Sequence, residues 1–314
     1  MVIVLQQPDA TIKFCDASRD ESCHQVRVLI VFNPAAGRRR AQRLWRVLDL
    51  LVQNGIRLEL AETGHRGHAT LLAREAAARG AGLIVAAGGD GTIAEVANGL
   101  SGAGVALGVI PLGTANVLAH ELGLPFAPRA VAAALAFGRT RFLWPGIARG
   151  PSGERLFVQM LGAGFDAAVV HHLPDALKRV LGRGAYVAQS LREIACYRFP
   201  PLHLRLDGKE RDAASVIVSK GRFYAGRHLL APGASPTDRG FTVAVFRRRG
   251  PFSALLSGAL LPFDLLPHAP GMDLVRAAAV DIEGGAPAQA DGDPAGMASL
   301  RITDAPAPIA IVSG

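Results

Sequence analysis

A glycine-rich pentapeptide, Gly88-Gly89-Asp90-Gly91-Thr92, separates an apolar run from a run of helical period. The preceding residues 83–87 are all apolar, as in a buried parallel strand. The glycines let backbone N–H groups approach an anion, and the N-terminus of the following helix adds partial positive charge. An aspartate in such a loop would repel a bare phosphate, so the pattern indicates a cation or a hydroxyl nearby. We therefore expect ATP chemistry at this turn.

The same order of strand and helix recurs from residue 26 onward. A succession of strand–helix units predicts an α/β nucleotide-binding domain with a doubly wound parallel sheet. Ligands of such sheets bind outside the carboxyl ends of the strands, where the glycine-rich turns fall. The expected strands are 28–32, 57–61, 83–87 and 105–110, and the expected helices are 40–54, 68–79, 92–100 and 116–122.

The pattern changes after residue 142, where short strand candidates alternate with turns. This predicts a mostly-β second domain, packed as a sandwich or partial barrel. The expected domains are an N-terminal extension (1–25), a nucleotide-binding domain (26–142), to which the C-terminal segment can return, and a β-rich domain (143–314). The strand candidates are 156–161, 202–206, 215–219, 242–246, 278–282, 298–302 and 309–312, and helical stretches are expected at 175–197 and 252–266.

The amino-acid composition narrows the classes of protein to which this chain can belong. The 314 residues carry a net charge of +8, which favours an acidic partner such as a nucleotide, a nucleic acid or an anionic membrane. Aromatic residues make up only 6% and no reader motif occurs, so we expect no nucleic acid partner. Three cysteines without metal or disulfide spacing are typical of the cytoplasm. The most hydrophobic stretch, 251–270, is interrupted by two prolines and an aspartate, so we expect no membrane span.

Three further segments also follow predicted strands and could bind an anion in the same way as the pentapeptide. They are Asn33-Pro34-Ala35-Ala36-Gly37, the turn beginning at Thr63, and Pro111-Leu112-Gly113-Thr114-Ala115-Asn116. Each supplies backbone N–H groups, a hydroxyl or an amide. Because the carboxyl ends of parallel strands share one edge of the sheet, we expect these segments to lie together.

Taken together, these segments resemble the diacylglycerol kinase and sphingosine kinase superfamily, in its bacterial YegS-like lipid kinase branch. The resemblance runs from Val28 to about Val312, because the N-P-x-x-G, G-G-D-G-T-x-x-E-V and P-x-G-T-x-N motifs stand in the family's order. Similar later motifs are residues 162–167, 221–226 and 291–293. A lone G-G-D-G-T is weaker evidence, since NAD kinases and phosphofructokinases carry it too.

The resemblance implies that ATP, with Mg²⁺, lies across the strand ends of the first domain. The γ-phosphoryl group would pass in line to a lipid hydroxyl, with diacylglycerol as the leading substrate and the β-rich domain receiving the lipid. The residues that match the family's nucleotide-binding motifs are Asn33, Thr63, Gly88, Gly89, Asp90, Gly91, Thr92, Glu95, Gly113, Thr114 and Asn116.

The group that accepts the hydroxyl proton is expected late in the chain. The family uses the glutamate of a D-G-E motif, and this chain has Asp293 at that place, shorter by one methylene. The reach of the carboxylate therefore decreases by roughly an ångström, about one C–C bond, which matters for a base that needs hydrogen-bond distance. Asp291 and Asp90 are the other candidates.

A second departure concerns a structural Mg²⁺ that the family holds in its β domain, at a D-D-G turn. Here the turn reads Asp238-Arg239-Gly240, and a guanidinium repels a cation and cannot bind it. We expect this metal site to be lost, or rebuilt around Asp238 with Arg239 as an internal cation. Mg²⁺ bound by the carbonyls of Pro236 and Phe241 would contradict that expectation.

Two arginine clusters are candidates for contact with an anionic membrane: the helix from Arg38, with Arg39, Arg40, Arg43 and Arg46, and the run 247–249. A plain solvated basic face is the alternative for the helix. We therefore expect peripheral association of a cytoplasmic protein with the membrane, and the sequence leaves a homodimer open.

Two other functions remain open at this point. The first is a soluble-substrate kinase of the NAD kinase type, against which the P-x-G-T-x-N and late Asp291-Gly292-Asp293 motifs argue. The second is a lipid-binding regulator that has lost catalysis, which the departures at Asp293 and Arg239 allow.

Overall fold

The computed structural model describes residues 2–5, 27–34, 38–174 and 183–314. The chain divides into two compact units. Unit 1 comprises Met1–Leu143 and Ala307–Gly314, and unit 2 comprises Trp144–Pro306. The last residues of the chain therefore belong to the same unit as its N-terminal part.

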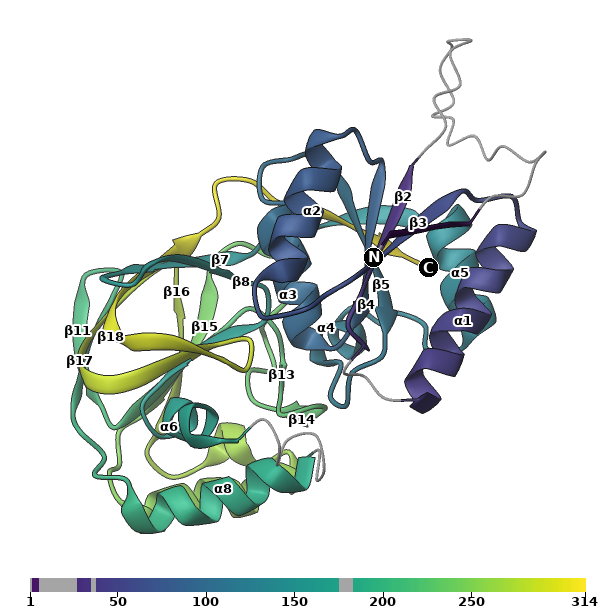
Figure 1. Ribbon diagram of the computed structural model, residues 1–314. Helices are drawn as coiled ribbons and strands as arrows, with labels where there is room; N and C mark the ends of the chain where they lie inside the picture. The colour runs from purple at the N-terminus through teal and green to yellow at the C-terminus, as the bar shows by residue number, and fades with distance from the viewer. Residues whose placement is uncertain (1, 6–26, 35–37, 175–182) are drawn as a thin grey trace. The chain divides into compact units, whose positions relative to one another are not determined.

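Within the described residues, unit 1 is built on a seven-stranded sheet in the order β1-β3-β2-β4-β5-β19-β6 (Figure 1). Strands β3, β2, β4, β5 and β19 run parallel, and β1 and β6 pair antiparallel at the two edges. This confirms the predicted parallel α/β fold. The strands are β1 (Val2–Leu5), β2 (Val28–Phe32), β3 (Leu58–Glu62), β4 (Leu83–Gly88), β5 (Ala106–Pro111), β6 (Arg139–Leu143) and β19 (Ile309–Ser313).

Helices cover both faces of this sheet (Figure 1). Helices α1 (Arg38–Gln53) and α5 (Pro128–Phe137) lie on one face, and α2 (His68–Ala78) and α3 (Asp90–Gly99) lie on the other. The short α4 (Val117–Glu121) follows β5. Helix α1 buries Leu44, Val47, Leu48 and Leu51 against the sheet and α5, as its apolar spacing predicted.

Two edge strands of unit 1 were not predicted. Residues 1–25 were expected to form a peripheral extension, but Val2–Leu5 pair with β3 as β1. Residues 6–25 lie outside the described part of the chain. Strand β6 was missed because four of its five residues are exposed, so no apolar pattern marks it. At an edge, backbone pairing with one neighbour is enough to define a strand without such a pattern.

The described part of unit 2 is built on one large antiparallel sheet of ten strands. The main order is β16-β15-β12-β9-β17-β18-β7-β8, and β10 pairs with both β11 and β17. The strands are β7 (Gly146–Gly150), β8 (Gly153–Phe157), β9 (Met160–Ala163), β10 (Leu202–Leu206), β11 (Lys209–Ala213), β12 (Ser215–Ser219), β15 (Phe241–Phe246), β16 (Met272–Ala277), β17 (Ala279–Ala290) and β18 (Asp293–Asp304), with β13 (Phe223–Tyr224) and β14 (His228–Leu229) forming a separate pair.

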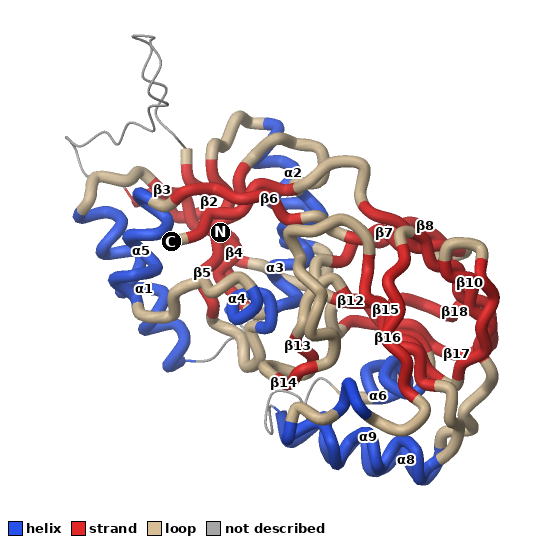
Figure 2. The backbone as a smooth tube through the Cα atoms, turned by 180° about the vertical axis from the view of Figure 1, so that it is seen from behind, coloured by secondary structure: helices blue, strands red, loops and turns tan. Residues whose placement is uncertain are grey.

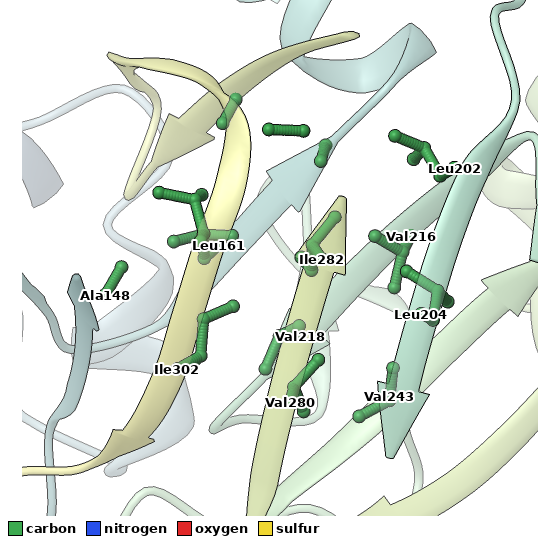
Figure 3. Close-up of a cluster of buried hydrophobic side chains, with 14 of the residues drawn as sticks. Ala148, Leu161, Leu202, Leu204, Val216, Val218, Val243, Val280, Ile282 and Ile302 are labelled. Atoms are coloured by element: carbon green, nitrogen blue, oxygen red, sulfur yellow. The ribbon is translucent and has the colours of Figure 1, made fainter. Parts of the chain in front are cut away.

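Strand β17 lets this sheet enclose a core. Its first part pairs with β10 and its last part with β9, and the register shifts on either side of Pro287. Side chains from both parts point into one apolar cluster, which Figure 3 shows with Leu161, Leu204 and Ile282 among its members. The mostly-β second domain is thereby confirmed.

Unit 2 differs from the expectation in several details: strands β7, β11 and β16 were not predicted, and the strand expected at 309–312 is β19 of unit 1. The strand expected at 156–161 is interrupted after Phe157, because the N–H groups of Val158 and Gln159 donate to the carboxylate of Asp291 instead of to a neighbouring strand. Helix α6 (Phe165–His172) was not predicted, because so short a helix carries little periodicity.

The remaining helices of unit 2 lie near the positions that the sequence indicated. They are α8 (Arg183–Cys196), α9 (Pro251–Leu260) and the 3₁₀ turns η2 (Leu261–Phe263) and η3 (Leu266–His268). Residues 175–182 of the expected helix lie outside the described part of the chain. In the described residues, no helix is both long enough and apolar enough to cross a bilayer.

Candidate functional site

Four predicted segments meet at one edge of the sheet of unit 1, where the parallel strands end. The N–H of Asn33 donates to the carbonyl of Ala87 over 3.2 Å, and the N–H of Thr63 donates to the carbonyl of Phe32 over 2.9 Å. The N–H of Leu112 donates to the carbonyl of Gly88 over 2.8 Å. These bonds join the ends of β2, β3, β4 and β5 into one continuous rim. Residues 35–37 of the first segment lie outside the described residues.

Glycines let two of these segments approach each other closely. A Cβ on Gly113 would lie only 2.5 Å from the Cα of Gly89 and 2.5 Å from Oδ1 of Asn116. A Cβ on Gly88 would lie 2.4 Å from Oγ1 of Thr92. A side chain at Gly113 would therefore force the two loops apart, and one at Gly88 would displace Thr92 within the pentapeptide. Loops that expose bare backbone next to a helix N-terminus are suited to hold phosphate.

Asp90 connects the pentapeptide to the P-x-G-T-x-N segment. Its Oδ1 accepts the N–H of Leu118 at the start of α4, over 3.2 Å. Burial raises the pKa of the Asp90 carboxyl, and the N–H groups of Leu118 and Val117 partly oppose that shift. The carboxylate thus fixes the position of the next loop, in addition to any role that it has toward a ligand.

Asn116 closes its own loop with its side-chain amide. The N–H of Gly113 donates to its Oδ1 over 2.7 Å, and its Nδ2 donates to the carbonyl of Gly113 over 2.8 Å. Its backbone is in the left-handed region (φ 47°), which asparagine tolerates better than most residues. The side chain is therefore used to shape the loop that carries Thr114.

Glu95 holds the loop before α2. Its Oε1 accepts the N–H of Gly67 over 2.9 Å and its Oε2 accepts the N–H of Ala69 over 3.1 Å. The hydroxyl of Thr70 donates to the backbone carbonyl of Glu95 over 2.8 Å. A carboxylate on the first N–H groups of a helix satisfies donors that lack intrahelical acceptors. In this structure Glu95 acts as a positioning residue, and the nucleotide contact expected of it stays a prediction.

Arg40 lies at the same rim, which the sequence did not indicate. Its Nη2 donates to Oγ1 of Thr114 over 2.8 Å. Sequence reasoning had grouped Arg40 with the other arginines of α1 as a membrane contact, since only the tertiary fold brings it to Thr114. Glycine loops, the N-terminus of α3 and a guanidinium together give a donor set that fits the phosphates of ATP.

We predict that Gly113→Ala weakens ATP binding by roughly tenfold or more, a loss of about 1.4 kcal/mol. The new methyl group would collide with the backbone at Gly89 and displace the loops that form the rim. Isothermal titration with ATP measures the effect. Gly233→Ala is the control, since its methyl group would meet nothing within 4 Å. Equal affinities in both variants would contradict a nucleotide site at this rim.

In unit 2, Asp291 and Gly292 form the tight turn between β17 and β18. Both have positive φ (50° and 84°), as a two-residue hairpin turn of type I′ requires. The carboxylate of Asp291 accepts the N–H groups of Val158, Gln159 and Met160 over 2.7–3.0 Å. Asp291 therefore has a structural task, which is to fix this turn against the segment between β8 and β9.

Asp293, the first residue of β18, is placed differently. Its Oδ2 lies 3.6 Å from Nη2 of Arg155, and its side chain is 22% exposed. Arg155 also donates from Nη1 to the carbonyl of Pro294 over 2.9 Å. The two carboxylates of this turn therefore have different surroundings, since Asp291 accepts three backbone N–H groups and Asp293 lies beside Arg155. The choice of Asp293 as the proton acceptor stays a prediction.

A buried network of polar side chains is hydrogen-bonded to the turn between β17 and β18. Nε2 of Gln289 donates to Oδ2 of Asp166 over 2.8 Å, and the hydroxyl of Tyr224 donates to Oδ1 of Asp166. Oε1 of Gln289 accepts the N–H of Gly292 over 2.8 Å. Burial raises the pKa of the Asp166 carboxyl, and the bonds from Tyr224 and Gln289 partly oppose that shift. The three later motifs of the sequence are joined by this network.

The turn at Asp238 holds the ammonium group of Lys220. Nζ donates to the carbonyls of Asp238 and Gly240 over 2.9 and 3.0 Å and to Oδ1 of Asp304 over 2.8 Å. The Lys220 side chain is fully buried, and burial lowers its pKa while Asp304 opposes that shift. Lys220 is a site residue that sequence reasoning missed.

These residues do not fit the structural Mg²⁺ of the family. An ammonium and a divalent cation cannot share the same oxygens, and the carbonyl of Pro236 accepts the N–H of Trp144 over 2.8 Å. The expectation was a lost metal site or one rebuilt around Asp238 with Arg239 as internal cation, and the cation at the turn carbonyls is Lys220 rather than Arg239. The guanidinium of Arg239 lies 4.2 Å from the ring of Trp144, in a cation–π contact. In the residues that the structure describes, no group of three or more His, Cys, Asp or Glu side chains could hold a metal ion.

Two family models match consecutive parts of this chain. The model of the diacylglycerol kinase catalytic domain matches residues 27–143. The model of the YegS C-terminal NAD kinase beta sandwich-like domain matches residues 159–313. The two matches together span the strand ends of unit 1 and the β17–β18 turn of unit 2.

Curated relatives cover most of the chain. The diacylglycerol kinase of Bacillus subtilis strain 168 is 32% identical over 231 residues, which are 71% of this chain and 74% of that protein. A protein of Pseudomonas putida KT2440 named "Probable lipid kinase YegS-like" is 32% identical over 271 residues, 82% of this chain and 85% of that protein. A solved structure described as a diacylglycerol kinase of Bacillus anthracis Sterne covers 92% of this chain and 97% of its own, with a TM-score of 0.67. Its 18% identity supports the fold alone.

Proposed function

Because this chain belongs to the family of diacylglycerol kinases and YegS-like lipid kinases, we propose that it phosphorylates a lipid hydroxyl with ATP. Diacylglycerol is the proposed acceptor. Unit 1 binds the nucleotide in this proposal, and unit 2 binds the lipid. The observation that carries it is the rim of unit 1, where loops at Asn33, Thr63, Gly89 and Gly113 come together at the strand ends.

Each part of the rim has a task in this proposal. Backbone N–H groups at the start of α3 and in the loop of Gly113 bind the phosphates, and Thr114 and Arg40 add a hydroxyl and a positive charge. Mg²⁺ bound with the nucleotide would supply positive charge to the phosphates, and Asp90 is the residue that we propose holds it. Glu95 and Asn116 hold the loops in place.

The transfer step needs a group that accepts a proton. The lipid hydroxyl oxygen forms a bond to the γ-phosphorus, the bond from that phosphorus to the bridging oxygen breaks, and ADP leaves with the electron pair. The hydroxyl proton passes to the carboxylate of Asp293. Asp291 keeps the turn in shape through its three N–H bonds. Phosphatidic acid is the product when diacylglycerol is the acceptor.

An acceptor panel tests the proposal. The protein is incubated with Mg²⁺ and ATP labelled at the γ-phosphate, in mixed micelles that contain diacylglycerol, sphingosine, ceramide or monoacylglycerol, and in parallel with NAD. We expect label in the lipid phase, strongest with diacylglycerol. Label in NAD alone would favour the soluble-substrate alternative. Binding of ATP without label in any acceptor would favour a regulator that has lost catalysis.

A further inference from the structure

Helix α9 of unit 2 is apolar yet has no buried residue. Its sequence, PFSALLSGAL, contains no charged side chain. Phe252 is 77% exposed, and Phe263 in the adjoining η2 is 74% exposed. Leu255 and Leu265 are also exposed large apolar side chains. Helices of soluble proteins normally bury an apolar face of this kind, as α1 does, so this surface is typical of a binding site.

Exposed apolar side chains also occur on the neighbouring helix. Helix α8 lies beside α9 in Figure 2, and residues of the two helices are in contact. Val187 and Leu191, four residues apart on α8, are exposed large apolar side chains as well. Residues four apart lie on the same face of a helix. We call the exposed side chains Phe252, Leu255, Phe263, Leu265, Val187 and Leu191 the α8–α9 surface.

This surface rests on a well-fixed base. Leu266, directly after it, is buried in an apolar cluster to which Leu260 and Leu261 also pack. The carboxylate of Asp264 accepts the N–H of Leu229 over 2.7 Å. The phenylalanines are therefore presented to solvent by a segment that is packed and hydrogen-bonded from the inside. Exposure of this kind is a feature of the fold rather than of a loose loop.

The charge near the surface is mainly basic, with one exposed carboxylate, Asp264, between Phe263 and Leu265. Arg247, Arg248 and Arg249 lie directly before α9 and are exposed. Arg247 pairs with Asp273 over 3.0 Å. On α8, Arg192 is exposed, whereas the neighbouring Glu193 is buried. An apolar patch bordered by arginines matches the interface of an anionic bilayer, with apolar interior and acidic headgroups.

We propose that the α8–α9 surface docks unit 2 on an anionic lipid bilayer, with Phe252 and Phe263 inserted among the acyl chains. The proposal rests on the proposed lipid kinase function and adds the part of the protein that meets the membrane. It assigns this task to unit 2 rather than to the arginines of α1, of which Arg40 is bound to Thr114. The arginines before α9 contact the headgroups.

Sedimentation with vesicles of phosphatidylcholine and phosphatidylglycerol tests the proposal. We expect the double variant Phe252→Asp, Phe263→Asp to bind these vesicles at least about tenfold more weakly than the wild-type protein, because two apolar anchors are lost and two charges are added. The matched control is Phe137→Asp, Phe142→Asp in unit 1, whose phenylalanines are 67% and 61% exposed. The control should bind within about twofold of the wild-type protein. Circular dichroism checks that all variants are folded.

Lipid composition and activity complete the test. Wild-type protein should bind anionic vesicles more tightly than pure phosphatidylcholine vesicles, and the preference should fall with salt. We also compare the phosphorylation rate on vesicle diacylglycerol with the rate on a soluble short-chain diacylglycerol. The ratio of the first rate to the second should fall only in the double variant Phe252→Asp, Phe263→Asp. Unchanged vesicle binding by that variant overturns the docking surface. If the double variant lost vesicle binding but the wild-type protein phosphorylated neither substrate, the docking surface would be upheld and the kinase proposal refuted.

Discussion

Replacing Asp293 by asparagine is expected to lower kcat for lipid phosphorylation by about 10²- to 10⁴-fold, the range typical of a lost general base. The amide keeps the shape of the side chain but cannot take the hydroxyl proton. The substitution removes the charge that lies 3.6 Å from Arg155, and circular dichroism checks that the variant is folded. Steady-state kinetics in mixed micelles, at saturating ATP, measure the change in kcat.

Two variants control this experiment. Asp49→Asn, on the exposed side of α1, should leave kcat unchanged. Asp291→Asn should lower the melting temperature, because an amide cannot replace a carboxylate that accepts three N–H groups. If Asp293→Asn retained full activity while Asp291→Asn lost it without a loss of stability, the base would be Asp291 and our assignment would be wrong.

Lys220→Met is expected to lower the free energy of unfolding by about 3–5 kcal/mol, the cost typical of removing one partner of a buried ion pair. The Met side chain fills most of the volume but leaves two turn carbonyls without their donor. Asp304 would keep only its bond from the N–H of Gly240, over 2.7 Å. Urea unfolding followed by circular dichroism measures the loss.

The control for this effect is Lys209→Met, on an exposed position of β11, which should change stability by less than about 0.5 kcal/mol. Since the turn already holds an ammonium, wild-type protein without nucleotide should melt at the same temperature in EDTA and in excess Mg²⁺. A large rise in melting temperature with Mg²⁺, together with a small effect of Lys220→Met, would show that a metal ion stabilises the turn after all.

The central strands β2, β4 and β5 of unit 1 could be predicted because they are buried on both faces of the sheet. Continuous apolar runs such as Leu83–Gly88, each followed by a glycine turn and a helix, have few other interpretations. Strand β6 has the opposite property. Its residues Arg139–Leu143 are mostly exposed, and only pairing with β19, at the far end of the chain, makes them a strand. Such pairing leaves no local pattern.

Contacts between distant residues are also what the sequence did not indicate at the candidate sites. The rim of unit 1 followed from the rule that parallel strands end at one edge, which needs no knowledge of side-chain contacts. The pairing of Lys220 with Asp304 joins residues 84 positions apart, and that of Gln289 with Asp166 joins residues 123 apart. Neither has a characteristic spacing. For the same reason, the distinct tasks of Asp291 and Asp293 could not be separated from the sequence.

Mass spectrometry of the lipid, after incubation of the wild-type protein with ATP, Mg²⁺ and diacylglycerol, shows whether the γ-phosphoryl group reaches this acceptor. If the chain is a lipid kinase with this acceptor, phosphatidic acid and ADP form in equal amounts, and neither forms with Asp293→Asn above the background rate. If ADP forms without phosphorylated lipid, or if wild type and Asp293→Asn give the same yield of phosphatidic acid, transfer to diacylglycerol with Asp293 as the base is contradicted.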